Sequence, residues 1–354
     1  MDRIEKRRIG WDILRIVFAG IVFAFHANIH LHLTFGLLTD YVSVGAFCMT
    51  GFFMLSGAVL YLKYGEKTLD KSEILEFYQK RLKGILPLYF VVMFLFYLDN
   101  PFTGDDALLL PIEILGLQSL FPGSFSIGHN SGTWFVSCLL VCYFIFPLIN
   151  EIIIGMRTRT MIILGVCLGV FDIYAQLITG NYGFGELYSA PFLRCIQFVI
   201  GCIVCSVIRR KTTKLHNSTI IIGLICCTVM SGALITWMVQ DNSFQGIAYL
   251  QKLAMYDIVV VPCFIITIYL AGQLTVDKSI VGRVLGNLSG LSYAFFLAQF
   301  FVWDRAQEIF LRYKITQNKI KVVIAFLLCI VITALLHFAF EKPIQYVLKR
   351  KKCK

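Results

Sequence analysis

The chain has 354 residues, of which 58% are hydrophobic and only 15% are charged. Long apolar runs recur throughout it, which excludes an ordinary soluble domain and is typical of a polytopic integral membrane protein. The formal net charge of +11 would suit a nucleic-acid partner by its size alone, so the positions of the charges have to decide that question.

Ten apolar windows follow one another along the chain. About 20 apolar residues in a helix cross the hydrocarbon core of a bilayer. The third window is short, and the ninth is interrupted by Gly286, Ser289, Gly290 and Ser292. We therefore expect an all-α fold, a polytopic membrane helical bundle with about ten transmembrane helices. The predicted spans are 10–29, 41–62, 84–98, 133–150, 159–178, 191–208, 218–239, 253–272, 284–303 and 320–340.

The connections between these spans leave no room for an appended soluble domain. The longest are 64–83 and 99–132, and both are too short to fold independently. We expect a single transmembrane domain over residues 1–354. The connection 99–132 is rich in Gly, Pro, Ser and aromatic residues, a composition that would allow it to fold as a lid over a cavity.

The basic residues of the connections predict the orientation. With the N-terminus in the cytoplasm, every inside segment carries Lys or Arg, and the first three outside loops carry essentially none. The loop 99–132 instead holds Asp99, Asp105, Asp106 and Glu113. This is a positive-inside pattern, and it places both termini in the cytoplasm. The net charge is therefore mostly a topology signal, and we expect no nucleic-acid partner.

One connection departs from this pattern. The outside segment after the ninth span is basic. Either it binds something anionic or the ninth span is misplaced, with two short helices or a re-entrant helix in its position. Its basic residues are Arg305, Arg312, Lys314, Lys319 and Lys321.

Ionisable side chains inside spans are rare in membrane proteins and mark function by default. Asp12, Arg194 and Glu341 lie near predicted helix ends, where snorkelling to the interface is the simpler explanation. The full set is Asp12, Arg15, His26, Asp172, Arg194, Asp257, His337 and Glu341.

Arg15 and His26 are harder to explain by snorkelling. They are eleven residues apart, so in a helix they return to within about 20° of one face, separated by roughly 16 Å along the axis. In the predicted orientation Arg15 lies toward the cytoplasm and His26 toward the outside. Spacing alone leaves two interpretations open: a path across the membrane, or a snorkelling Arg with a His hydrogen-bonded to a neighbouring helix.

His26, His30 and His32 form a short histidine cluster. The i, i+4 spacing of His26 and His30 occurs in zinc sites, but no acidic residue or Cys lies nearby in the sequence. The twelve cysteines are scattered in apolar runs, where they behave as small apolar side chains. We expect no metal site.

Six motifs occur in order along the chain. The first is WDILRIVFAGIVFAFH, in which ten residues separate Arg15 from His26. Together they resemble the acyltransferase-3 family of integral-membrane acyltransferases, whose members include bacterial O-antigen and peptidoglycan O-acetyltransferases. The other motifs are GFFMLSGAVL at 51–60, FYQKRLKGILPLY at 77–89, TWFVSCLLVCYFIFPLI at 133–149, LSYAFFLAQF at 291–300 and FEKP at 340–343.

The chain departs from the family pattern at two positions. The family often has a second Arg in the basic segment, where this chain has Gly84, and often a His late in the ninth helix, where it has Gln299. The first departure bears on contacts with the acyl donor. The second suggests a different acceptor or a different local pairing.

The resemblance implies a membrane O-acyltransferase that moves an acyl group, usually acetyl, from cytoplasmic acyl-CoA to a hydroxyl of a carbohydrate acceptor. That acceptor would be a cell-surface polysaccharide or its lipid-linked precursor, and the enzyme would lie in the bacterial cytoplasmic membrane. His26 would act as the general base or carry the acyl group. Arg15 would polarise the thioester, stabilise the oxyanion or hold the pantetheine.

The same resemblance suggests where the substrates bind. Arg81, Lys80 and Lys83 lie at the expected cytoplasmic mouth and are candidate contacts for the CoA phosphates. For Phe53, Trp134 and Tyr293, each taken alone, packing is the favoured explanation. The residues expected to line a substrate or structural pocket are Asp12, Phe53, Ser56, Trp134, Tyr293 and Glu341.

A transporter or permease of a small molecule or lipid-linked sugar, without acyl transfer, remains the alternative function. Charged residues in spans and a basic outer loop suit it equally well. A transporter would need no CoA, so movement of a labelled acetyl group distinguishes the two. The sequence leaves the acceptor and the oligomeric state open.

Overall fold

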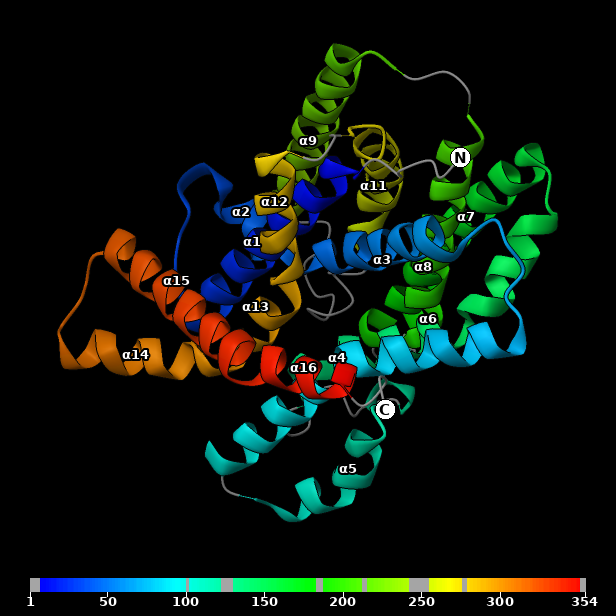
Figure 1. The fold of residues 1–354 in the computed structure, drawn as a ribbon. Coiled ribbons are helices and arrows are strands. Elements are labelled where there is room, and N and C mark those ends of the chain that lie inside the picture. Colours follow the sequence, from blue (N-terminus) through cyan, green and yellow to red (C-terminus); the bar gives the residue numbers. More distant parts are fainter. Residues whose placement is uncertain are drawn as a thin grey trace.

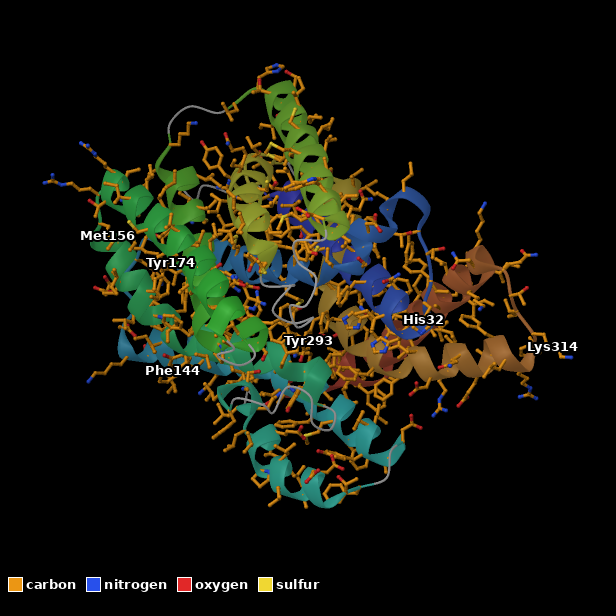
Figure 2. All side chains as sticks on the ribbon, turned by 180° about the vertical axis from the view of Figure 1, so that it is seen from behind. His32, Phe144, Met156, Tyr174, Tyr293 and Lys314 are labelled. Atoms are coloured by element: carbon orange, nitrogen blue, oxygen red, sulfur yellow. The ribbon has the colours of Figure 1, made fainter. Side chains whose placement is uncertain are left out.

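The computed structural model is built from helices (Figure 1). All of its regular elements are helical, as expected for a membrane bundle, and large apolar side chains such as Phe144 lie on the outer surface, where a bilayer would cover them (Figure 2). The residues that the structure describes are 7–99, 102–121, 130–182, 187–211, 215–241, 255–275 and 279–350.

The ten predicted spans all coincide with helices. Within the described ranges, nine helical segments are long and apolar enough to cross a membrane, and the shorter apolar helix α11 (Asp257–Ala271) occupies the eighth predicted span. The polytopic all-α fold is therefore confirmed. The nine segments are Ile9–Leu31, Gly45–Tyr64, Lys71–Asp99, Gly132–Gly155, Thr158–Gln176, Pro191–Arg210, Asn217–Gln240, Ile280–Phe301 and Asn318–Leu348.

Several predicted boundaries were wrong. The third span is α4 (Lys71–Asp99), which begins 13 residues before the predicted 84–98 and continues through Pro87. The extension is amphipathic: Phe77 is buried, while Lys71 and Glu73 lower the local hydropathy. The last span, α15 (Asn318–Leu335), continues through a π-helical turn (Leu336–Glu341) into α16 (Lys342–Arg350).

The start of the second predicted span, 41–62, is also divided. A short helix, α2 (Thr39–Ser43), and a 3-10 turn (Gly45–Phe47) precede α3 (Cys48–Tyr64), which forms the core of the span. The remaining long helices are α1 (Ile9–Leu31), α6 (Asn130–Gly155), α7 (Thr158–Tyr182), α8 (Pro191–Arg210) and α9 (Asn217–Gln240).

The ninth predicted span is broken into pieces. It consists of α12 (Ile280–Gly290), α13 (Ser292–Ala298) and a 3-10 turn (Gln299–Phe301), and a separate helix, α14 (Trp303–Arg312), follows it. Small and polar residues lie at the break, and pairs of Gly and Ser are common sites of sharp kinks in helices. The ninth span thus contains two short helices, which was one of the alternatives predicted for it, and the basic outer connection begins with α14.

Helix α14 meets α15 at a connection that projects from the bundle, with Lys314 at its tip (Figures 1 and 2). Arg305 of α14 forms an ion pair with Asp99 at the end of α4 and another with Glu308, at 3.0 Å. Part of the basic charge of this connection is thus neutralised within the protein.

The closest helix contact is between α3 and α8, which pack against each other in the centre of the bundle. Their crossing depends on two glycines. A Cβ atom on Gly57 would lie 1.9 Å from the carbonyl oxygen of Phe198, and one on Gly201 would lie 1.8 Å from that of Met54. Small residues at such a crossing let two membrane helices approach closely.

The outside connection contains α5 (Gly104–Ile114) and a 3-10 turn (Gln118–Leu120). Glu113 is fully buried there: its carboxylate accepts a hydrogen bond from Tyr97 at 2.6 Å, and its carbonyl oxygen accepts one from Tyr89 at 2.6 Å. Figure 1 shows α5 set apart from the main bundle. Residues 100–101 and 122–129 of the predicted lid lie outside the described residues.

Candidate functional site

A cavity of about 350 Å³ lies between α1, α3, α4, α6, α12 and α13. We call it the Arg15 cavity. Its walls are largely aromatic and aliphatic, and its charged lining comes from two helices and the π-helical turn. Seven of the eleven residues predicted for the site line it: Arg15, Phe53, Ser56, Lys80, Arg81, Tyr293 and Glu341.

Arg15 is half-buried and faces this cavity from α1. Within the described ranges no side chain or backbone carbonyl accepts a hydrogen bond from its guanidinium, and no carboxylate pairs with it. An unpaired cation in an apolar setting is costly. The Arg15 guanidinium is therefore suited to hold an anionic or strongly polar group of a bound molecule.

Arg81 and Lys80 provide further positive charge in the lining. The Arg81 guanidinium donates a hydrogen bond to the Tyr64 hydroxyl at 3.2 Å and lies 5.3 Å from the centre of the Tyr64 ring and 5.9 Å from that of Tyr143. The aromatic rings hold the guanidinium in place without neutralising it. Lys80 forms an ion pair with Glu76 at 3.0 Å, and its side chain is 44% exposed. The end of the cavity at Lys80 is therefore the open mouth.

Lys83 was predicted as a third cation of this group, but the structure does not place it in the cavity lining. It lies two residues after Arg81, on another face of α4, and its carbonyl oxygen accepts a hydrogen bond from Gln345 at 2.5 Å. Gly84 does line the cavity, and a Cβ atom there would meet no atom within 4 Å. At this position, where the family often has an Arg, the chain has Gly84, and the space that a side chain would occupy at the mouth is open.

Two further predicted residues join the cavity to its surroundings. The Tyr293 hydroxyl donates a hydrogen bond to the carbonyl oxygen of Ile85 at 3.1 Å, which ties α13 to α4; Figure 2 shows Tyr293 near the middle of the bundle. Glu341 pairs with His337 at 2.7 Å. The π-helical turn brings these two side chains together on the side facing α4.

His26 lies outside the lining of the Arg15 cavity. Its ring is packed in an aromatic cluster: the ring centres of His30, Trp303 and Phe296 are 5.7, 6.0 and 6.3 Å away. Phe296 also lines the cavity. Arg15 and His26 therefore do not share one cavity in this structure, and the Phe296 ring contacts both the cavity and His26.

Asp12 and Trp134 were also predicted to line the pocket, and neither does. Asp12 accepts hydrogen bonds from Arg7 at 2.6 Å and from Ser289 at 2.6 Å, so it anchors the start of α1 to α12. Trp134 packs behind Phe53, with ring centres 6.2 Å apart. Asp12 and Trp134 therefore support residues that line the cavity.

A buried polar network behind Trp134 was missed by the sequence analysis. Arg194 of α8 is only 3% exposed, so the predicted snorkelling was wrong. Its guanidinium donates to the carbonyl oxygen of Tyr188 at 2.9 Å, to Thr50 at 3.0 Å and to Gln197 at 2.8 Å. Its ring contacts include Trp134, at 5.3 Å.

Two carboxylates complete this network. Thr50 donates to Asp257 at 3.0 Å, and the amide of Gln197 donates to Asp172 at 3.0 Å and to Asp257 at 3.4 Å. Thr50 and Gln197 therefore bridge Arg194 to both acids. The sequence did contain a signal, because Gln197 follows Arg194 by three residues on the same helix face.

The histidine cluster is aromatic packing in this structure: the His30 ring stacks on Trp303 at 5.5 Å with an interplanar angle of 12°. In the described part of the chain, no group of three or more His, Cys, Asp and Glu side chains is arranged to hold a metal ion.

Comparison with known proteins identifies the family. The acyltransferase-3 family model, described as an acyltransferase domain, matches residues 8–341. Among curated proteins, the chain is 23% identical to the acyltransferase MdmB of Streptomyces mycarofaciens over 344 residues, which cover 89% of this chain and 84% of that protein. No solved structure matches the chain. The matched region includes every residue that lines the Arg15 cavity, and the chain belongs to the acyltransferase-3 family of multi-pass membrane acyltransferases.

Proposed function

We propose that this acyltransferase moves an acyl group, acetyl in the simplest case, from acyl-CoA to a hydroxyl of a carbohydrate acceptor. The observation that carries the donor assignment is the charge distribution of the Arg15 cavity. Lys80 and Arg81 lie at its open mouth, its walls are apolar, and Arg15 faces it without a partner among the described residues.

These features match the parts of an acyl-CoA. Phosphates need cations, and the planar guanidinium of Arg81 is suited to pair with phosphate oxygens in a bidentate manner. The pantetheine arm is thin, and its methylene groups can pack against apolar cavity walls such as those formed by Phe52, Phe53 and Leu139. The thioester oxygen needs a donor, and Arg15 supplies one.

The reaction balances with the groups present. The acceptor hydroxyl oxygen attacks the thioester carbon, and Arg15 stabilises the negative charge that develops on the carbonyl oxygen. The carbon–sulfur bond breaks as the ester carbon–oxygen bond forms. The hydroxyl proton goes to His26 and then to the departing thiolate, so CoA leaves as a thiol.

The acceptor is assigned on family grounds and on the side of the membrane that His26 faces. In the predicted orientation His26 lies on the outer half of α1, where a polysaccharide or its lipid-linked precursor in the cytoplasmic membrane of a bacterium would be accessible. A carbohydrate hydroxyl is a weak nucleophile that needs a base near neutral pH, and imidazole is such a base.

Two measurements test the donor assignment. The first is equilibrium binding of CoA to the purified protein in detergent. Arg81→Gln should weaken binding about 10- to 100-fold, because a hydrogen bond to a charged group contributes about 1.5–3 kcal/mol. Lys71→Gln on the same helix is the matched control, since Lys71 is exposed and does not line the cavity. Equal CoA affinity in the wild type and Arg81→Gln would remove Arg81 from the donor site.

The second measurement follows labelled acetyl groups in membranes that contain the protein, acetyl-CoA and the host's surface glycans. Transfer to glycan supports the proposal, and His26→Ala should reduce it by about two to four orders of magnitude. A label that stays on CoA while solute crosses the membrane would support a transporter instead. Full activity of His26→Ala would refute the role of His26 as base.

A further inference from the structure

Two aromatic rings line the Arg15 cavity on the side away from Arg81, because Phe135 lies eight residues, about 12 Å along α6, before Tyr143, whose ring centre is 5.9 Å from the Arg81 guanidinium. Phe135 of α6 and Phe296 of α13 both line the cavity, and their ring centres are 4.3 Å apart in an edge-to-face arrangement at 65°. Such pairs are attractive beyond their buried area. We call these two residues the aromatic end wall.

Other aromatic rings pack against the end wall. Phe135 is 7% exposed and contacts Tyr293, with ring centres 6.0 Å apart. Phe296 has the His26 ring on its far side, at 6.3 Å. Ala294, two residues before Phe296 on α13, is buried. A group that enters from the mouth therefore reaches closely packed rings at the end of its path.

The space in front of this wall is small. A volume of about 350 Å³ lies near the lower limit of the range of about 300–1,000 Å³ found for small-molecule sites. If the phosphates stay at Lys80 and Arg81, as the proposed function requires, the leading end of the donor is its acyl group, and that end lies against Phe135 and Phe296.

From this geometry we propose that Phe296, together with Phe135, sets the length of the acyl group, admitting acetyl and rejecting chains of four or more carbons. This inference rests on the proposed function, because it takes acyl-CoA as the donor. An apolar wall discriminates by about 10- to 200-fold for one methylene group, so a butyryl group, with two more methylenes than acetyl, should be strongly disfavoured.

The test is a competition between acetyl-CoA and butyryl-CoA at equal concentration, with the full-length protein in membranes and the same acceptor. The quantity measured is the ratio of the two esters formed. The wild type should favour acetyl at least about tenfold. Phe296→Ala should shift the ratio toward butyryl by at least about tenfold, because removing the ring opens the end of the cavity.

Matched variants separate this effect from general damage. Phe295→Ala removes a neighbouring ring of the same helix that packs against Phe23 and Phe326 instead, and it should keep the wild-type ratio. Phe296→Leu and Phe135→Leu make smaller openings and should give smaller shifts in the same direction. They also keep the test decisive if Phe296→Ala fails to fold.

Each outcome decides one of the two proposals. If the wild type transfers acetyl from acetyl-CoA but accepts butyryl equally well, or if the Phe296 and Phe135 variants keep the wild-type ratio, the end wall does not set acyl length and the inference is wrong. If the wild type transfers neither acyl group from CoA, the proposed donor is wrong and the inference falls with it.

Discussion

The buried network around Arg194 predicts a large loss of stability when its single cation is removed. In Arg194→Met, a side chain of similar length replaces the guanidinium, so little packing volume is lost. The variant loses the hydrogen bonds to Tyr188, Thr50 and Gln197. The carboxylates of Asp172 and Asp257, which are 0% and 2% exposed, lose the positive charge that faces them.

The magnitude follows from this environment. Removing one partner of a buried ionic group costs about 3–5 kcal/mol, because the remaining charge stays buried without compensation. Neutralising an acid as well should return part of this cost. The double variant Arg194→Met/Asp257→Asn should therefore be more stable than Arg194→Met alone, with a coupling energy of about 1–3 kcal/mol.

The assay is the free energy of unfolding in detergent micelles, measured by denaturant titration on the wild type, both single variants and the double variant. Arg159→Met is the matched control, because Arg159 is exposed at the start of α7. An Arg194→Met variant as stable as the control, or a double variant with no coupling energy, would refute the view that this network is an ion cluster on which the fold depends.

Three further predictions address the helix crossing and the cavity. In the same titration, Gly201→Ala should destabilise the protein by at least about 1–3 kcal/mol, because its Cβ would lie 1.8 Å from the Met54 carbonyl oxygen. Gly232→Ala is the control and should change the stability little, because a Cβ there meets nothing within 4 Å. Gly84→Arg should bind CoA about tenfold more tightly, because a Cβ at that position has open space in the cavity mouth; unchanged affinity would show that the phosphates bind elsewhere. Arg15→Gln should lower the rate of acetyl transfer by about 100- to 1,000-fold in the labelled-acetyl assay, and a wild-type rate would exclude Arg15 as the oxyanion donor.

Apolar windows predicted the number and order of the helices because a bilayer demands about 20 apolar residues for each crossing. They failed where apolar character is confined to one face. Residues 71–83 belong to α4 and bury Phe77, yet Lys71 and Glu73 lower the average that a window measures. Ser289 and Gly290 indicated an interruption of the ninth span, but the geometry of the break between α12 and α13 depends on the helices packed around it.

The candidate site was predicted in part for a similar reason. Helical periodicity states which side chains share a face of one helix, and it placed Arg15 and His26 on one face of α1. Helical periodicity does not state which neighbouring helix covers that face at each depth in the membrane. The same limit explains Arg194: its position near a predicted helix end suggested snorkelling, while the acids that surround it come from α7 and α11, far away in sequence.

The shared face of Arg15 and His26 takes on a different meaning once the neighbouring helices are known. Arg15 faces a cavity whose mouth carries Lys80 and Arg81, and His26 lies on the other side of the Phe296 ring. Under the proposed function, a donor held by the mouth would reach Arg15 directly, while the acceptor hydroxyl would meet His26 from the outer side. Transfer would then require the Phe296 ring to turn aside. That ring sits on the seven-residue helix α13, which is bounded by a break at each end, so in this proposal the broken ninth span carries the element that has to move.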